Sequence, residues 1–124
     1  MPVIPTPTEP THPLPHAAFT ALATPTRGSR ETSVWRAVIA PGTPGVPHQV
    51  TREEIFVVLA GAARVVLADV ESTATIGDAI VVPPDTRFQI EAAGAAPLEL
   101  VCCMPVGGQA RTADGQVFTP PWAR

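Results

Sequence analysis

Short β-prone segments, separated by turn residues, fill the chain from residue 32 to residue 104. The segments are rich in Val, Ile and other strand-forming residues, and the separators contain Gly, Pro or Asp. No window of more than about ten residues repeats its apolar residues with a helical period. This pattern predicts an all-β domain, either a barrel or a sandwich. We expect its strands at residues 33–40, 47–50, 54–60, 64–68, 72–76, 79–82, 87–91 and 98–104.

The two ends of the chain differ from this central part. Residues 1–15 contain six prolines, which exclude a helix and leave few backbone donors for a sheet. We therefore expect residues 1–31 to form an extended arm, residues 32–106 the barrel, and residues 107–124 a C-terminal tail. Because this tail holds two aromatic residues, it should pack on the barrel or on a partner.

The composition limits which partners and which cellular compartment we expect for this chain. The net charge is −3 and there is no basic cluster, which argues against nucleic acid and anionic membranes as partners. No stretch approaches the ~20 apolar residues of a membrane span, and no signal-peptide pattern is present, so we expect a cytoplasmic protein. The absence of Lys, Asn and Tyr is typical of a GC-rich bacterial genome. The adjacent Cys102 and Cys103 would point to opposite faces of a strand and stay free thiols.

The stretch at residues 45–61 carries the most information about function. Its His48, Glu54 and Gly61 have the spacing of the first signature of the cupin family, which the chain resembles. In that signature a second histidine follows the first by two positions, and Val50 stands there in this chain. The resemblance implies a double-stranded β-helix, the cupin-type jelly-roll barrel, with the proline-rich segment as an extended N-terminal arm.

A later stretch, residues 77–88, resembles the second cupin signature. Gly77 and Pro83 match it, whereas Asp85 stands in place of a glycine and Phe88 in place of a histidine. In cupins that bind metal, two histidines and the glutamate of the first signature converge with the histidine of the second inside the barrel. This chain therefore keeps half of that ligand set.

A metal site reduced to His48 and Glu54 offers two protein ligands. Catalytic zinc and iron sites usually keep three. We therefore expect no tightly bound metal cofactor. The alternative is a divalent transition metal such as Zn, Ni or Fe, held by His48 and Glu54 with a further ligand from elsewhere in the chain.

His48 and Glu54 are also the candidate catalytic residues. Strand alternation and the motif count direct both side chains into the barrel, where we expect them within reach of each other. Imidazole acts as acid or base near neutral pH, and a carboxylate in an apolar barrel must be paired, hydrogen-bonded or protonated. The alternatives are a histidine held by a backbone carbonyl and a glutamate that caps backbone donors.

Apolar residues take the place of the missing ligands. They are consistent with a lumen that is lined by hydrophobic side chains around a few polar groups, as small-ligand pockets are. The same residues also fit a filled core. The expected pocket residues are Val50, Phe56, Val58, Ile80, Val82, Phe88 and Ile90.

Three functions remain open at this stage. The first is a small cupin-fold protein whose apolar pocket binds a small organic molecule, with proton-transfer chemistry such as isomerisation, dehydration or cyclisation and no tightly bound metal. The second is a metal-dependent cupin oxygenase or isomerase with a reduced ligand set. The third is a non-catalytic small-molecule-binding or sensor cupin. In each case we expect a homodimer, because pairing protects the open edges of the sheets.

Overall fold

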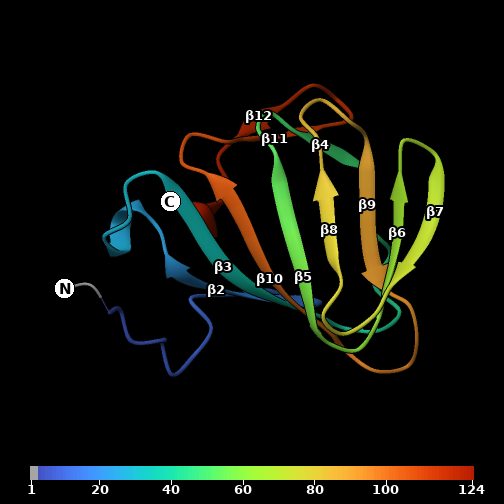
Figure 1. Ribbon diagram of the computed structural model, residues 1–124, viewed down its shortest axis with the longest axis horizontal. Helices are drawn as coiled ribbons and strands as arrows, with labels where there is room; N and C mark the ends of the chain where they lie inside the picture. The colour runs from blue at the N-terminus through green and yellow to red at the C-terminus, as the bar shows by residue number, and fades with distance from the viewer. Residues whose placement is uncertain (1–2) are drawn as a thin grey trace.

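The computed structural model describes residues 3–124, which form two facing antiparallel sheets (Figure 1). Within this described range no α-helix occurs, and the only helical segments are the short 3-10 turns η1 (Pro25–Arg27) and η2 (Pro121–Ala123). The prediction of an all-β jelly-roll barrel is confirmed.

The first sheet has six strands in the order β1-β2-β3-β10-β5-β8, and neighbouring strands in it are antiparallel. Figure 1 shows β2, β3, β10, β5 and β8 following one another across the view. The strands of this sheet are His12–Pro13 (β1), Ala17–Ala23 (β2), Thr32–Ile39 (β3), Leu98–Pro105 (β10), Glu54–Ala60 (β5) and Ala79–Val82 (β8).

The second sheet also has six antiparallel strands, in the order β12-β11-β4-β9-β6-β7. Its strands are Val117–Phe118 (β12), Ala110–Thr112 (β11), His48–Val50 (β4), Phe88–Ala92 (β9), Ala63–Leu67 (β6) and Val70–Ala74 (β7).

Residues 17–23, which the sequence analysis placed in the N-terminal arm, form strand β2. This segment contains no proline, so its backbone can pair along β3, from Ala17 opposite Ile39 to Ala23 opposite Val34. The residues before it are also tied to the domain: His12–Pro13 (β1) pairs with β2, and the guanidinium of Arg27 donates a hydrogen bond of 2.8 Å to the carbonyl oxygen of Pro5.

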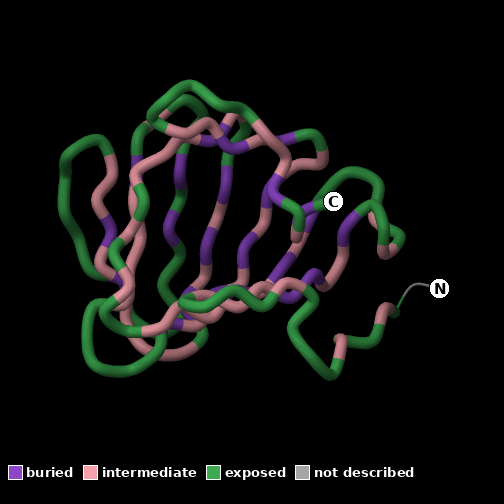
Figure 2. Tube along the Cα trace, turned by 180° about the vertical axis from the view of Figure 1, so that it is seen from behind, coloured by how far each residue is buried: buried purple, intermediate pink, exposed green. Residues whose placement is uncertain are grey.

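Burial alternates along the strands (Figure 2). Since successive side chains point to opposite faces of a sheet, the buried residues are those that face the space between the sheets. In β10 the side chains of Leu98, Leu100, Cys102 and Met104 are at most 1% exposed, while the residues between them are half-buried. Burying a Leu or Met side chain stabilises a fold by roughly 1.5–3 kcal/mol relative to exposing it. The inward rows therefore form the core and fix which residues can reach the interior.

Two turns carry the residues that stand at glycine positions of the two cupin signatures, Gly61 and Asp85. Gly61 follows β5 with φ of +73°, and a Cβ there would collide with the carbonyl oxygen of Pro97, so only glycine fits. Asp85 has φ of +57°, and its backbone N–H donates a hydrogen bond of 2.8 Å to the carbonyl oxygen of Val50. Its Oδ1 accepts a hydrogen bond of 3.0 Å from Nη1 of Arg111. Asp tolerates this left-handed conformation, so the turn survives the loss of the motif glycine.

None of the helical segments within residues 3–124 has the length and apolar character that a membrane crossing requires.

Candidate functional site

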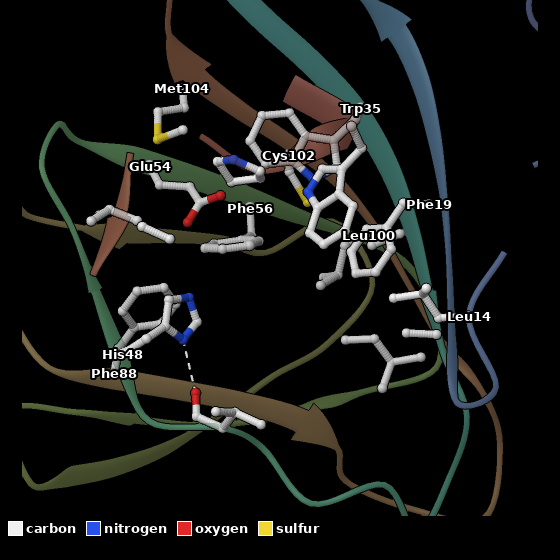
Figure 3. A pocket seen from close by; sticks show the side chains of 18 of the residues that line it. Leu14, Phe19, Trp35, His48, Glu54, Phe56, Phe88, Leu100, Cys102 and Met104 are labelled. Atoms are coloured by element: carbon white, nitrogen blue, oxygen red, sulfur yellow. Dashed lines mark hydrogen bonds between the residues drawn. The ribbon is translucent and has the colours of Figure 1, made fainter. Parts of the chain in front are cut away.

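A cavity of about 370 Å³ lies between the two sheets (Figure 3). Its walls are almost entirely apolar and come from β2, β3, β5 and β10 of the first sheet, from β4, β9, β11 and β12 of the second, and from the C-terminal turn. Leu14 and Val46 also line it and are 52% and 70% exposed, so the cavity opens to solvent at that end.

Glu54, the first residue of β5, points its carboxyl into this cavity (Figure 3). The residue is 5% exposed, and within residues 3–124 no hydrogen bond or ion pair involves its carboxyl group. Burial raises the pKa of Glu54 from 4.5 to about 8, because the charged form has lost its water. At neutral pH Glu54 therefore carries its proton and can donate a hydrogen bond.

His48, the first residue of β4, lies on the same cavity. Its Nδ1 is 2.8 Å from the carbonyl oxygen of Val46. A carbonyl only accepts, so Nδ1 carries the hydrogen and Nε2 of the neutral ring is left as the acceptor. Figure 3 shows this second nitrogen turned toward the interior of the cavity. The bond to Val46 therefore favours the tautomer with its hydrogen on Nδ1 and leaves Nε2 available to a ligand.

His48 and Glu54 share the cavity but are not hydrogen-bonded to each other. Among the interactions of residues 3–124, no hydrogen bond or ion pair joins them. Both side chains line the cavity as expected, but no direct hydrogen bond joins them, and Nδ1 of His48 bonds to the Val46 carbonyl oxygen instead. A ligand group would have to lie between the donor, Glu54, and the acceptor, Nε2 of His48.

Of the seven expected pocket residues, Val50, Phe56 and Phe88 line the cavity. The other four lie elsewhere in the interior, where the sheets pack directly: Val58, Ile80 and Val82 are buried core residues, and Ile90 is partly buried against that core. The cavity is displaced from β8 toward β3 and β2, the half of the sandwich that β4, β11 and the C-terminal segment cover.

The C-terminal segment closes one side of the cavity. Trp122 stacks on Phe19 of β2, with 3.7 Å between ring centroids and 4° between ring planes. The hydroxyl of Ser33, 1% exposed, donates a 2.8 Å hydrogen bond to the carbonyl oxygen of Ala123. These contacts bring Phe118 and Trp122 into the wall of the cavity.

Sequence reasoning missed several lining residues, among them Trp35, Phe19 and Leu100. The alternating apolar residues of β10 gave a signal for Leu100, since every second residue there faces inward. Nothing local in the sequence signalled that β2 would join the sheet and carry Phe19 to the cavity.

The donors present do not fit a divalent metal. Val50 and Phe88, at the two positions where the cupin signatures place histidines, line the cavity with groups that cannot coordinate. Within residues 3–124 no three His, Cys, Asp or Glu side chains come together as a metal site would require. Cys102 also faces the cavity, but burial raises its pKa well above the ordinary value and keeps it a thiol.

A family model described as "Cupin domain" matches residues 35–104. An uncharacterized protein of Methanocaldococcus jannaschii is 33% identical over 72 residues, which are 57% of this chain and 58% of that protein. The chain therefore spans less than two thirds of the length of this relative.

Solved structures agree in fold. KdgF from Halomonas sp. is 23% identical with a TM-score of 0.67 over 86% of this chain and 89% of that one. Vicilin from Solanum lycopersicum is 20% identical with a TM-score of 0.71, and the match covers 85% of this chain and 32% of vicilin. A salicylate 1,2-dioxygenase from Pseudaminobacter salicylatoxidans is 21% identical with a TM-score of 0.65, over 77% of this chain and 28% of the dioxygenase.

The segment matched by the family model contains both signatures, His48, Glu54 and the strands β4 to β9. It makes up more than half of the 124 residues, and the two-sheet architecture is that of the structural neighbours. The chain belongs to the cupin family.

Proposed function

We propose that the chain binds a small, mostly apolar organic molecule in the cavity and exchanges protons with it through Glu54 and His48, without a tightly bound metal. The observation that carries this proposal is the buried carboxyl of Glu54, which faces an apolar cavity and has no partner within residues 3–124. A carboxyl in such a place costs stability unless it stays protonated. Strongly perturbed groups in cavities are typical of functional sites.

The size and lining of the cavity support a small ligand. A volume of about 370 Å³ is at the lower end of the range of roughly 300–1,000 Å³ for ligand pockets. Apolar walls with a few convergent polar groups are the usual make-up of such pockets. Here the two groups are complementary, because one donates and the other accepts.

The pair suits a proton-shift isomerisation. In a ketone with a nearby carbon–carbon double bond, Glu54 would donate its proton to the ketone oxygen while Nε2 of His48 removes a proton from the carbon between the carbonyl and the double bond, which gives a dienol. His48 would then return its proton to the far carbon of the dienol as the oxygen proton goes back to Glu54, and the double bond moves into conjugation with the carbonyl. The ligand keeps all of its atoms, and both side chains end in their starting states.

Binding is tested first, with N-phenylnaphthylamine, a neutral apolar dye that fluoresces in apolar sites. We expect saturable binding of one dye per chain. Ala37→Phe, which fills the cavity from β3, and Thr112→Trp, which narrows it from β11, should each abolish that signal. The matched control is Ala79→Phe, at an exposed position on β8. Equal dye binding by both cavity variants and the control would contradict the proposal.

Proton transfer is tested separately, with a neutral bicyclic ketone in deuterated buffer. We expect the protein to accelerate exchange of the hydrogens next to the carbonyl, as followed by NMR. Glu54→Gln and His48→Phe should each reduce that rate by about 10²-fold or more while keeping the fold. If the ketone binds and its hydrogens do not exchange, the cavity belongs to a non-catalytic binding protein.

A further inference from the structure

The chain places all of its Phe and Trp residues on one cavity. The sequence contains four Phe, two Trp and no Tyr. Each of these six side chains lines the cavity that holds Glu54 and His48: Phe19, Trp35, Phe56, Phe88, Phe118 and Trp122. The rest of the core is built from aliphatic residues, Cys and Met, so aromatic rings are not needed to fill the interior.

The six rings differ in how deeply they are buried. Trp35, Phe56 and Phe88 are at most 8% exposed and form the deep part. Phe19, Phe118 and Trp122 are only partly buried, although they also face the cavity. Partly buried rings around an apolar cavity leave aromatic surface available to a ligand.

Three of the six rings come from outside the part of the chain that the family model matches. Phe19 lies before residue 35, and Phe118 and Trp122 lie after residue 104. The segments beyond the shared domain thus add half of the aromatic wall, and the Phe19–Trp122 stack holds them together. These segments therefore make the wall of the cavity more aromatic, which favours a ligand with an aromatic surface.

The charges of the lining exclude most ionic ligands. In the part of the chain that the structure describes, no Arg lines the cavity, and Glu54 is neutral at pH 7 because burial raises its pKa to about 8. A carboxylate or phosphate ligand would find no permanently charged cation there and could pair only with His48, which would first have to take up a proton. The two polar contacts on offer are the hydroxyl of protonated Glu54 and Nε2 of His48.

We infer that the ligand of this cavity is an uncharged, flat aromatic molecule with an oxygen that hydrogen-bonds to Glu54 and His48. The inference rests on the proposed function and names its ligand class. Offset and edge contacts between ligand rings and the six aromatic side chains would supply selectivity over aliphatic molecules of the same size. The oxygen would orient the rings by meeting the two polar groups.

The test compares ligands that differ in one property each, by calorimetric titration at pH 7. The four probes are naphthol, its fully saturated analogue decalol, naphthoate, and the trimethylammonium derivative of the same ring. We expect naphthol to bind at least about 10-fold more tightly than each of the other three. The trimethylammonium probe is included because aromatic walls also attract cations.

A variant of the wall gives the second readout. Trp122→Leu keeps an apolar side chain in the partly buried C-terminal turn but removes the ring, and should weaken naphthol binding about 10-fold while changing decalol binding less than about 2-fold. Phe118→Leu provides the same test should the first variant unfold. Val117→Ala, at a 43% exposed position in the same segment, is the control.

The outcomes separate this inference from the proposed function. Decalol binding as tightly as naphthol would overturn the aromatic class and leave small-molecule binding standing. Tighter binding of naphthoate or of the trimethylammonium probe would overturn the uncharged class. If none of the four probes binds, the proposed function fails together with the inference.

Discussion

The imidazole of His48 lies against the ring of Phe88, with 4.4 Å between ring centroids and 47° between ring planes. The two residues are paired across β4 and β9. Phe88 is 2% exposed and also packs on Phe56, at a centroid distance of 5.9 Å. At this position, where the cupin signature places a histidine, the chain has a packed aromatic ring. Phe88 contributes to the packing of the core and cannot coordinate a metal ion, as a histidine at this position could.

This contact leads to a prediction about metal binding. Changing Val50→His and Phe88→His together should give the chain four candidate ligands, because both positions line the cavity beside His48 and Glu54. We expect the double variant to bind Ni²⁺ or Zn²⁺ at least about 10-fold more tightly than the unmodified chain, measured by calorimetry.

The matched control for the metal experiment is the pair Val50→Ala and Phe88→Ala, which removes bulk without adding donors. It should bind metal no better than the unmodified chain. Tight uptake by the unmodified chain would show that a ligand outside the two signatures completes a site.

Glu54 should make the stability of the protein depend on pH. Its pKa is about 8 in the folded state against 4.5 for an ordinary glutamate, so between these values the folded chain holds a proton that the unfolded chain releases. Stability therefore falls as pH rises through this window, by about 1.4 kcal/mol per unit and by roughly 5 kcal/mol at most. Urea unfolding at pH 5, 7 and 9 measures this loss.

Glu54→Gln removes the titrating proton and should flatten that profile, which makes the variant more stable than the parent at pH 9. Glu53→Gln, at the exposed neighbouring position, should reproduce the parent profile. A Glu54→Gln variant that still loses stability from pH 5 to pH 9 would assign the titration to another group.

Ser33 should anchor the C-terminal segment. Ser33→Ala removes the buried 2.8 Å hydrogen bond to Ala123 and leaves that carbonyl without its donor, which should cost about 1–3 kcal/mol. We expect faster proteolytic cleavage after residue 105 as well, since the segment is then held by fewer contacts. Ser72→Ala, in an exposed part of β7, should change neither quantity; equal effects of the two variants would rule out the anchor.

The homodimer expected from the sequence stays a prediction. Leu59 and Val81 are 45% and 48% exposed and lie on the outer face of the neighbouring strands β5 and β8. Exposed apolar residues on a sheet face favour association. We expect light scattering to give a dimer at micromolar concentration, and Leu59→Glu with Val81→Glu to give a monomer. A monomeric parent chain contradicts the prediction.

The sequence was most informative where local rules decide the structure. Alternation and motif spacing placed Glu54 and His48 on the inward side of their strands, and the turn residues marked the strand limits from residue 32 to residue 105. Both rules depend on neighbours within a few positions. Both rules therefore apply regardless of which distant segments of the chain pack nearby.

The position of the cavity could not be predicted by such rules. Val58 and Phe56 face the same side of β5, yet only Phe56 lines the cavity, because its surroundings include residues brought from β2, β10 and the C-terminal turn. Alternation says that a side chain points inward and does not say whether another side chain fills the space in front of it. That depends on contacts between residues far apart in the sequence.

The apolar wall has a thermodynamic consequence. A buried water molecule needs two to four polar partners, and the lining offers few beyond Glu54 and His48. The cavity should therefore hold few ordered water molecules before a ligand binds, and ligand binding should release few of them. Ligand binding should then be driven by the enthalpy of new contacts between rings, with a negative heat-capacity change. The entropy gained when water leaves a hydrated apolar surface should contribute less.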